Sequence, residues 1–462
     1  MRILLKLATG LLIFCCVATP IVGAQTLPAA DADPRIQQLV ASISAQRLRE
    51  LDVKLASFGT RHTLSDTKSA TRGIGAARQW IYEEFKRASS KLQVSFDAYM
   101  LAPQGRITRQ VELRNVMAVL PGKSPRRIYI SGHYDSLNLG AGAQIASNVR
   151  AADAPAAPDR QQQPDFDHNA PAPGANDDGS GTALTMELAR VFANSGVEFD
   201  ATLVFICWAG EEQGLVGSRA HVQTLKEKQI PVEAVFNNDI VGNSMGGNGV
   251  VDAETVRVYS AGPQESSSRA LARHIERVAA IYAPAHRIRV MAREDRFLRG
   301  SDHSSFSQEG FAAVAFREAN ENFAKQHSAN DTVDGVDFNY LAQNTRVNAA
   351  AAASLALAPP APKVTGERGQ PLISRDPSGY DASLRWNASP GAVAYRIYWR
   401  DAGVSDWQRQ QTVGNVTHFV LPNVSIDDYA FGVAAVGADG HESLVSAYTE
   451  TPRSRADVKI VK

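Results

Sequence analysis

The spacing of apolar residues changes repeatedly along the first three quarters of the chain. Between residues 74 and 88, Ile74, Ile81 and Phe85 fall on one face of a helix, with charged side chains largely opposite. Strands are predicted at 127–131, 202–208, 234–236 and 312–316, helices between them at 183–193, 218–228 and 267–281, and a helical lead-in at 25–50. Alternating strands and helices predict an α/β fold with a mostly parallel mixed sheet and helices on both faces.

The pattern changes after a Pro-rich linker at 358–364. Strands are predicted beyond it at 382–386, 394–399, 417–421 and 430–436, and this regular spacing is typical of a β-sandwich. Trp386 and the stretch 427–436 resemble a fibronectin type III domain, which predicts such a domain at 365–462. Its aromatic residues Tyr395, Tyr398 and Trp399 suit either the core or a contact surface. The domain is therefore a candidate for contact with a surface or polymer.

Residues 141–173 interrupt the alternation of strands and helices. They are rich in Ala, Pro, Gln and Asp and have almost no large apolar residues, which predicts a flexible surface insertion. The insertion either overhangs the neighbouring motifs or is a spacer without a role. His168 within it, and His62 before it, are predicted to be surface residues.

The first 24 residues have the order of an export signal. Arg2 and Lys6 precede a short apolar run at 7–17, and small residues at 22–24 suit cleavage before Gln25. The run is shorter than the roughly 20 residues that span a bilayer, which argues against an uncleaved anchor. The sequence therefore predicts a signal peptide at 1–24, a secreted or periplasmic protein, and no stable membrane insertion after cleavage.

Composition narrows the partners and the chemistry. Lys+Arg and Asp+Glu both number 48, so no basic excess points to nucleic acid. Cleavage of the signal would leave Cys207 as the only cysteine, which excludes an intramolecular disulfide. Because Cys207 follows the apolar run 203–206, it is predicted to be a buried structural thiol rather than a nucleophile.

Polar motifs follow the first predicted strand and precede the next helix. In His133-Tyr-Asp135 the histidine can bind a metal, and the carboxylate two residues on can accept its other N–H. Asp177 and Asp178 lie in the Gly-rich turn 174–181, where adjacent carboxylates repel each other unless a cation or hydrogen bonds neutralise them. Asp178 also suits a helix cap.

Three further motifs follow the later strands. Glu211-Glu212 comes after 202–208, and such a pair suits a division of labour in which one binds metal and the other takes a proton from bound water. Asp239 follows 234–236, and His327 lies beyond 312–316. Functional groups gather at the carboxyl ends of strands in such sheets. The candidate ligands are therefore His133, Asp177, Glu212, Asp239 and His327, a set without sulfur that suits two zinc-like ions.

Taken together, the motifs resemble the M28 family of zinc aminopeptidases over residues 35–355, and the loop 301–306 also matches that family. The resemblance implies a peptidase domain at 25–357 with two Zn²⁺ per chain. It makes His133 and Asp239 terminal ligands of one zinc. It makes Glu212 and His327 terminal ligands of the other, with Asp177 as the bridge.

The resemblance also implies the catalytic roles. Glu211 aligns with the general base, and Asp135 aligns with the carboxylate that orients His133. The implied reaction removes N-terminal residues from peptides or proteins, by attack of a metal-bridging water that Glu211 activates. Gln326 stands where relatives often have an aromatic residue, and this departure leaves substrate preference open.

Three other functions stay open. One is a glutaminyl cyclase-like transferase, and another is an M28 carboxypeptidase or dipeptidase. The third is a binding protein in which the C-terminal sandwich does the work and the metal site is degenerate. The intact Glu211 and the five matching ligands argue against the third.

Overall fold

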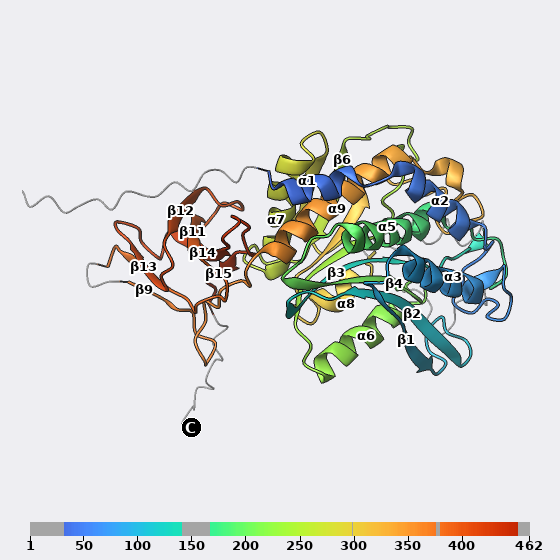
Figure 1. Ribbon diagram of the computed structural model, residues 1–462, viewed down its shortest axis with the longest axis horizontal. Helices are drawn as coiled ribbons and strands as arrows, with labels where there is room; N and C mark the ends of the chain where they lie inside the picture. Colours follow the sequence, from blue (N-terminus) through green and yellow to red (C-terminus); the bar gives the residue numbers. More distant parts are fainter. Residues whose placement is uncertain (1–31, 141–166, 298, 376–378, 451–462) are drawn as a thin grey trace, which may run out of the picture.

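Two domains follow one another in the computed structural model, which describes residues 32–140, 167–297, 299–375 and 379–450 (Figure 1). The first holds a mixed sheet covered by helices, and the second consists of two smaller sheets. The predicted signal peptide at 1–24 and most of the predicted insertion at 141–173 lie outside the described residues.

The central sheet has eight strands in the order β1-β2-β4-β3-β5-β8-β6-β7. The neighbours β4–β3, β3–β5, β5–β8 and β6–β7 are parallel, and the other pairs are antiparallel. The strands are β1 (Gln93–Leu101), β2 (Val111–Leu120), β3 (Ser124–His133), β4 (Ala201–Trp208), β5 (Val232–Asn238), β6 (Thr255–Ser260), β7 (Arg287–Met291) and β8 (Ala313–Glu318).

Helices cover both faces of this sheet. Successive residues of a strand point to opposite faces, so they enter two different cores. Ile128 and Ile130 of β3 belong to the larger core, whereas Tyr129 between them belongs to the smaller one. The larger core is covered by α1 (Pro34–Ala41), α2 (Ala45–Ala56), α3 (Gly73–Ala88), α5 (Ser180–Asn194), α7 (Ser267–Tyr282) and α9 (Phe338–Leu357). The smaller core is covered by α6 (Val216–Glu227) and α8 (His303–Ser307) (Figure 1). The predicted α/β class is confirmed.

Several elements were not predicted, each for a physical reason. The edge hairpin β1–β2 is only partly buried along β1, so its apolar pattern is weak. Helix α9 is an alanine-rich helix buried on almost all sides, and such a helix has no polar face to mark its period. The single predicted lead-in is two helices, because Ser44 caps the start of α2 through a hydrogen bond from the Arg47 N–H.

The C-terminal domain is built from two antiparallel sheets. One has the order β13-β10-β9 and the other β12-β11-β14-β15. Trp386 and Tyr395 pack together in the core between them, with ring centroids 5.3 Å apart. Tyr398 is also buried, so these aromatic residues do not form an exposed contact surface. The strands are β9 (Ile373–Arg375), β10 (Ala382–Arg385), β11 (Ala394–Asp401), β12 (Arg409–Val413), β13 (His418–Leu421), β14 (Tyr429–Val436) and β15 (Ser446–Ala447).

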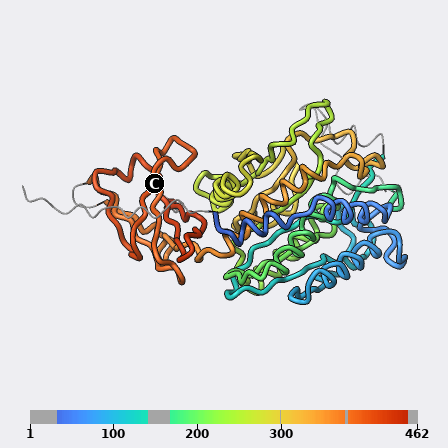
Figure 2. The backbone as a smooth tube through the Cα atoms, turned by 45° about the horizontal axis from the view of Figure 1, so that its top comes forward, coloured from blue at the N-terminus to red at the C-terminus, as the bar shows by residue number. Residues whose placement is uncertain are grey.

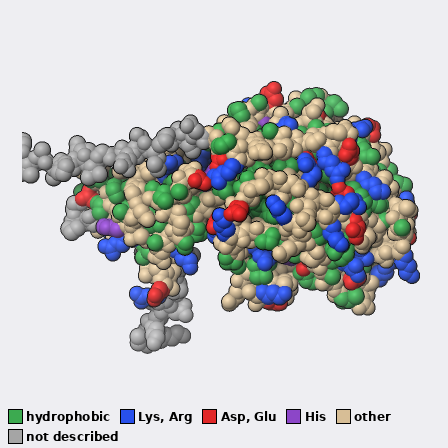
Figure 3. Space-filling view, in the orientation of Figure 1, with side chains coloured by type: hydrophobic (Ala, Val, Ile, Leu, Met, Phe, Trp, Pro, Cys, Tyr) green, Lys and Arg blue, Asp and Glu red, His purple; other side chains and the backbone are tan. Residues whose placement is uncertain are grey.

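The C-terminal sheets lie beside α1 and α7 (Figure 2), and charged residues join the two domains there. His441 Nε2 lies 2.8 Å from Asp33 Oδ2, and Arg35 pairs with Asp439 over 2.7 Å. Glu265 near the start of α7 pairs with the buried Arg400. The second domain is therefore docked on the first by specific ionic contacts. Positive and negative side chains are otherwise interspersed over the face seen in Figure 3.

Candidate metal centre

The ends of three neighbouring parallel strands bring most of the predicted ligands together. His133 is the last residue of β3, Glu212 follows β4 and Asp239 follows β5. These strands are adjacent in the order β4-β3-β5, so their carboxyl ends meet at one edge of the sheet. Asp177 comes from the short segment η2 (Ala175–Gly179) before α5, whose backbone is not helical at Asp177, and His327 comes from the loop after β8.

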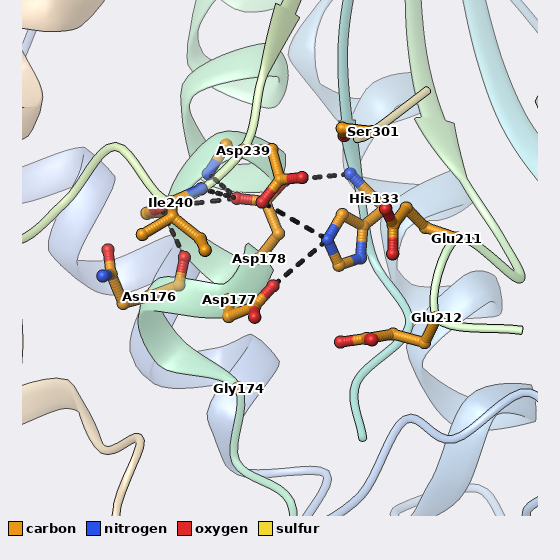
Figure 4. Close-up of polar contacts among 12 residues, drawn as sticks. His133, Gly174, Asn176, Asp177, Asp178, Glu211, Glu212, Asp239, Ile240 and Ser301 are labelled. Atoms are coloured by element: carbon orange, nitrogen blue, oxygen red, sulfur yellow. Dashed lines mark hydrogen bonds and ion pairs between the residues drawn. The ribbon is translucent and has the colours of Figure 1, made fainter. Parts of the chain in front are cut away.

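All five predicted ligands converge on one space. Figure 4 shows four of them: His133, Asp177, Glu212 and Asp239. His133 Nε2 lies 3.3 Å from Asp177 Oδ1 and 3.6 Å from Asp239 Oδ1. His327 Nε2 lies 3.0 Å from Asp177 Oδ2 and 3.3 Å from Glu212 Oε2. The two oxygens of Asp177 thus face two different histidines, which is the arrangement that a bridging carboxylate needs.

Electrostatics in this space favour a cation. Asp177, Glu212 and Asp239 are all buried, and burial raises the pKa of the Glu212 carboxyl to about 7. Burial acts to lower the pKa of His327, but the charges of Glu212 and Asp177 outweigh it and raise that pKa to about 9. Glu212 Oε1 and Asp239 Oδ1 have no hydrogen-bond partner among the described residues. Imidazole nitrogens and carboxylate oxygens with unused lone pairs fit zinc.

Asp135 supports the metal centre through three backbone groups. Its carboxylate accepts the N–H of Glu211 over 3.2 Å and the N–H of Glu212 over 3.2 Å. Its backbone carbonyl lies 3.1 Å from His133 Nδ1, closer than its carboxylate at 3.5 Å. His133 Nδ1 therefore faces two oxygens of Asp135, and the backbone carbonyl lies closer to it than the carboxylate that was predicted to orient the ring.

Asp178 does not join the ligands but ties the loops around them. Its Oδ1 accepts the N–H of Gly181 at the start of α5 over 2.8 Å, as predicted for a helix cap. Its Oδ2 accepts the N–H of His133 over 3.0 Å. Asp178 can also be grouped with His133 and Asp239 as a metal site. Because both of its oxygens already accept backbone N–H groups, we assign it a structural role.

Sequence reasoning missed two residues that hold the η2 segment. Asp331 accepts the N–H groups of Asn176 and Asp177 over 3.0 and 2.9 Å. Arg61 is fully buried and donates to the backbone carbonyls of Tyr134 and Gly174 over 2.5 and 2.8 Å. Asp331 lies in the same short motif as His327, which was the available signal. Arg61 has no recognisable motif around it.

Two predictions about the neighbouring loop are corrected. His62 is buried rather than on the surface, because its ring packs 4.7 Å from that of His168. Residues at the end of the predicted insertion 141–173 are also packed: the Ala172 N–H donates to Gly59 over 2.8 Å, and Ser136 donates to the Ala172 carbonyl over 2.8 Å. These two hydrogen bonds hold Ala172 in the fold, so the insertion ends before this residue and not at 173 as predicted.

The remaining candidates do not join the ligands. In the loop 301–306, Ser301 accepts a hydrogen bond from Asn237 over 2.9 Å, and His303 Nε2 lies 3.0 Å from the Glu294 carbonyl. These two side chains are therefore bonded to other partners and not to each other. Gln326 accepts from Arg299 over 2.6 Å. Cys207 is buried, as predicted, and burial raises the pKa of its thiol. Both His327 and Ile240, next to Asp239, have a positive φ, an uncommon backbone conformation that gathers at functional sites.

Comparison with known proteins decides the family. The model of peptidase family M28 matches residues 115–352. A "Probable zinc metalloprotease" of Pyricularia oryzae is 37% identical over 454 residues, which cover 89% of this chain and 84% of that protein. A protein of the same description from Pyrenophora teres f. teres is 37% identical, with 91% and 88% covered. The chain belongs to peptidase family M28. This M28 chain is accordingly a peptidase by family, and therefore a hydrolase.

Solved structures share the fold of this M28 protein. The aminopeptidase LapA of Legionella pneumophila matches with a TM-score of 0.52 and 22% identity, covering 71% of this chain and 76% of LapA. A glutaminyl cyclase of Porphyromonas gingivalis matches with a TM-score of 0.50 and 14% identity, covering 67% and 98%. Within the described residues, no helix has the length and apolar character that crossing a membrane requires.

Proposed function

We propose that the protein is an exported aminopeptidase that hydrolyses N-terminal residues from peptides with two zinc ions per chain. His133 and Asp239 would hold one ion, Glu212 and His327 would hold the other, and Asp177 would contribute to both. The observation that carries this assignment is the position of Asp177, whose two oxygens lie 3.3 and 3.0 Å from the Nε2 atoms of His133 and His327. A single-ion site would need only one of these contacts.

Glu211 is the proposed general base. Its backbone is fixed by Asp135, and its side chain stands beside His133 at the metal centre (Figure 4). Burial holds the pKa of the Glu211 carboxyl well above its usual value, although the charge of His133 opposes this. Zinc bound here would polarise the scissile carbonyl and make its coordinated water acidic near neutral pH. Glu211 takes the proton of the attacking water and returns it to the leaving nitrogen as the C–N bond breaks.

N-terminal selectivity is the finer part of the proposal. It is supported by the motif resemblance and is compatible with the fold shared with LapA. The glutaminyl cyclase fold is equally similar, so the fold alone does not separate hydrolysis from ring closure. The discriminating feature is the ligand set, because three carboxylates and two histidines supply enough donors for two ions.

Three matched peptides test this function. They share one sequence and differ at the N-terminus, which is a free leucine, an acetylated leucine or a free glutamine. The zinc-loaded protein should release leucine from the first peptide and leave the acetylated peptide intact, as read by mass spectrometry. Loss of ammonia from the glutamine peptide without cleavage would identify a cyclase. Cleavage of the acetylated peptide from its other end would identify a carboxypeptidase.

The domain assignments belong to the same proposal. Residues 25–357 form the peptidase, 358–364 the linker and 365–462 a fibronectin type III-like sandwich, after a signal peptide at 1–24. The C-terminal domain is not proposed to carry the chemistry, because the five metal ligands all lie before residue 328. N-terminal sequencing of the exported protein tests the signal: a mature start at Gln25 is expected.

A further inference from the structure

Arg317 lies fully buried at the end of β8, directly beside a proposed metal ligand. Its Nη1 is 2.7 Å from Asp239 Oδ2 and donates to the Asp239 backbone carbonyl over 2.8 Å. Its Nη2 donates to Asp295 Oδ2 over 2.9 Å. One oxygen of Asp239 is therefore held by a guanidinium. The other, Oδ1, faces His133 Nε2 at 3.6 Å and has no hydrogen-bond partner in the described part of the chain.

The charge of Arg317 is not cancelled by its second partner. Asp295 also pairs with Arg296, whose Nε lies 3.2 Å from Asp295 Oδ1. Arg296 reaches onward to Glu321 over 2.8 Å, and Glu321 in turn binds Arg257 and Arg299 over 2.7 and 3.1 Å. Apart from Asp239, these four arginines thus have only two carboxylates as partners in the described ranges, those of Asp295 and Glu321. This side of the metal centre carries an excess of positive charge.

The other terminal carboxylate has a different environment. Glu212 Oε2 pairs with His327 over 3.3 Å, and Oε1 has no hydrogen-bond partner among the described residues. Arg106 is the neighbouring cation, but it donates to the backbone carbonyl of Glu212, over 2.9 Å. The carboxylates of the two proposed zinc positions therefore differ: Asp239 pairs with an arginine side chain, whereas the Glu212 carboxylate pairs with the histidine of its own position among the described residues.

We propose that Arg317 is a positioning residue that directs Asp239 Oδ1 toward the metal and weakens the zinc position formed by His133 and Asp239. This inference rests on the proposed two-zinc site. A guanidinium on a ligand carboxylate withdraws electron density from it and repels a divalent cation, and both effects are strong in a buried site. The position formed by Glu212 and His327 fills first, and the position beside Arg317 fills second.

Zinc titration of the metal-free protein against a chromophoric chelator measures both positions without any activity assay. We expect two binding steps separated by at least about tenfold, in the range that partners of ligands produce. Asp239→Asn should keep the tighter step, and Glu212→Gln should remove it. A total of one zinc per chain would overturn the two-zinc proposal itself. Two ions with equal affinity would overturn only the role of Arg317.

Substitutions of Arg317 separate its charge from its hydrogen bonds. Arg317→Gln keeps a donor for Asp239 without the charge and should tighten the second step about tenfold, whereas Arg317→Lys keeps the charge and should leave the steps apart. Arg257→Gln is the matched control, because it removes a charge from the same cluster, and Arg257 donates to the Glu318 carbonyl, Tyr259 and Glu321 rather than to a metal ligand. An unchanged or weaker second step in folded Arg317→Gln contradicts the proposal. If that variant does not fold, Arg317→Lys decides, because merged steps with the charge retained would also contradict it.

Discussion

The carboxylate of Asp135 accepts a hydrogen bond from the backbone N–H of Glu211 over 3.2 Å. Its second oxygen accepts the N–H of Glu212 at the same distance, so one buried side chain fixes the proposed base and a proposed ligand together. The backbone carbonyl of Asp135 meanwhile faces His133 Nδ1 at 3.1 Å. Asp135 is therefore a positioning residue for both proposed zinc positions.

Asp135→Asn should weaken zinc binding by about 10- to 100-fold, because an amide oxygen can replace only one of the two acceptors and the NH₂ group would repel the other N–H. The measurement is zinc affinity by chelator competition. Asp97→Asn is the control, since Asp97 is a carboxylate of β1 that binds His221 over 3.0 Å, and His221 is not a proposed ligand. Equal losses of affinity in the two variants would mean that the effect reports folding and not the position of the ligands.

Glu211→Gln should keep the zinc content and lower kcat by about 10²- to 10⁴-fold, the usual contribution of a general base. Glutamine preserves the shape and the backbone hydrogen bond to Asp135 but accepts no proton. Metal analysis and steady-state kinetics on the same sample check both halves of this expectation. A variant that retains kcat with full zinc content would remove Glu211 from the mechanism.

His327→Ala should bind no more than one zinc per chain. The imidazole is the nitrogen donor of the Glu212 position, and its loss leaves that position with carboxylates alone. Elemental analysis after dialysis measures the content directly. His274→Ala provides a buried histidine for comparison, because His274 contacts the Ala351 carbonyl of α9 and should keep two zinc ions. Two ions in His327→Ala would show that this residue is not a ligand.

Acid should weaken the docking of the C-terminal domain through Asp33. Burial acts to raise the pKa of this carboxyl, but hydrogen bonds with Arg35 and His441 outweigh it and hold the pKa below its usual value. A depressed carboxyl pKa contributes stability that is complete above the unfolded value of about 3.9 and is lost as the pH falls through the folded value. The pair is partly exposed, so the contribution is about 1 kcal/mol or less.

Urea unfolding of wild-type protein and Asp33→Asn between pH 7 and pH 3 measures this contribution. The difference in unfolding free energy should be constant down to about pH 5 and shrink toward pH 3. Asp427→Asn, in an exposed pair with Arg375, should show no such difference at any pH. A difference for Asp33→Asn that stays constant to pH 3 contradicts the assigned role.

Local pattern was sufficient to predict the parallel strands β3, β4, β5 and β8 and to place candidate ligands after them, but it missed the parallel pair β6–β7. Apolar runs mark β3, β4, β5 and β8, and the polar residues that follow them meet at the sheet edge because parallel strands share a direction. Helix α9 was not predicted because it is buried on almost all sides and its sequence shows little alternation of apolar and polar residues. Strand β1 was not predicted because it is only partly buried. The ligand assignment itself came from combining five short motifs, none of which is decisive alone.

Residues that act through the backbone could not be predicted in this way. Arg61 holds the η2 segment by donating to carbonyl groups, which places no demand on the sequence around its partners. Arg317 meets Asp239 only because β8 pairs with β5, so the contact depends on strand order and not on spacing. Similarly, the packing of His62 on His168 joins a residue within the predicted insertion to one far before it in the sequence.

Stepwise return of zinc to chelated protein tests the central claim most directly. Hydrolysis of a panel of aminoacyl-nitroanilides is followed as zinc is added, and bound metal is counted in the same samples. Hydrolysis should be absent from the metal-free protein and should reach its maximum when two zinc ions are bound per chain. Hydrolysis that survives complete removal of metal, or a fully loaded protein that cleaves none of these substrates, would contradict a two-zinc aminopeptidase.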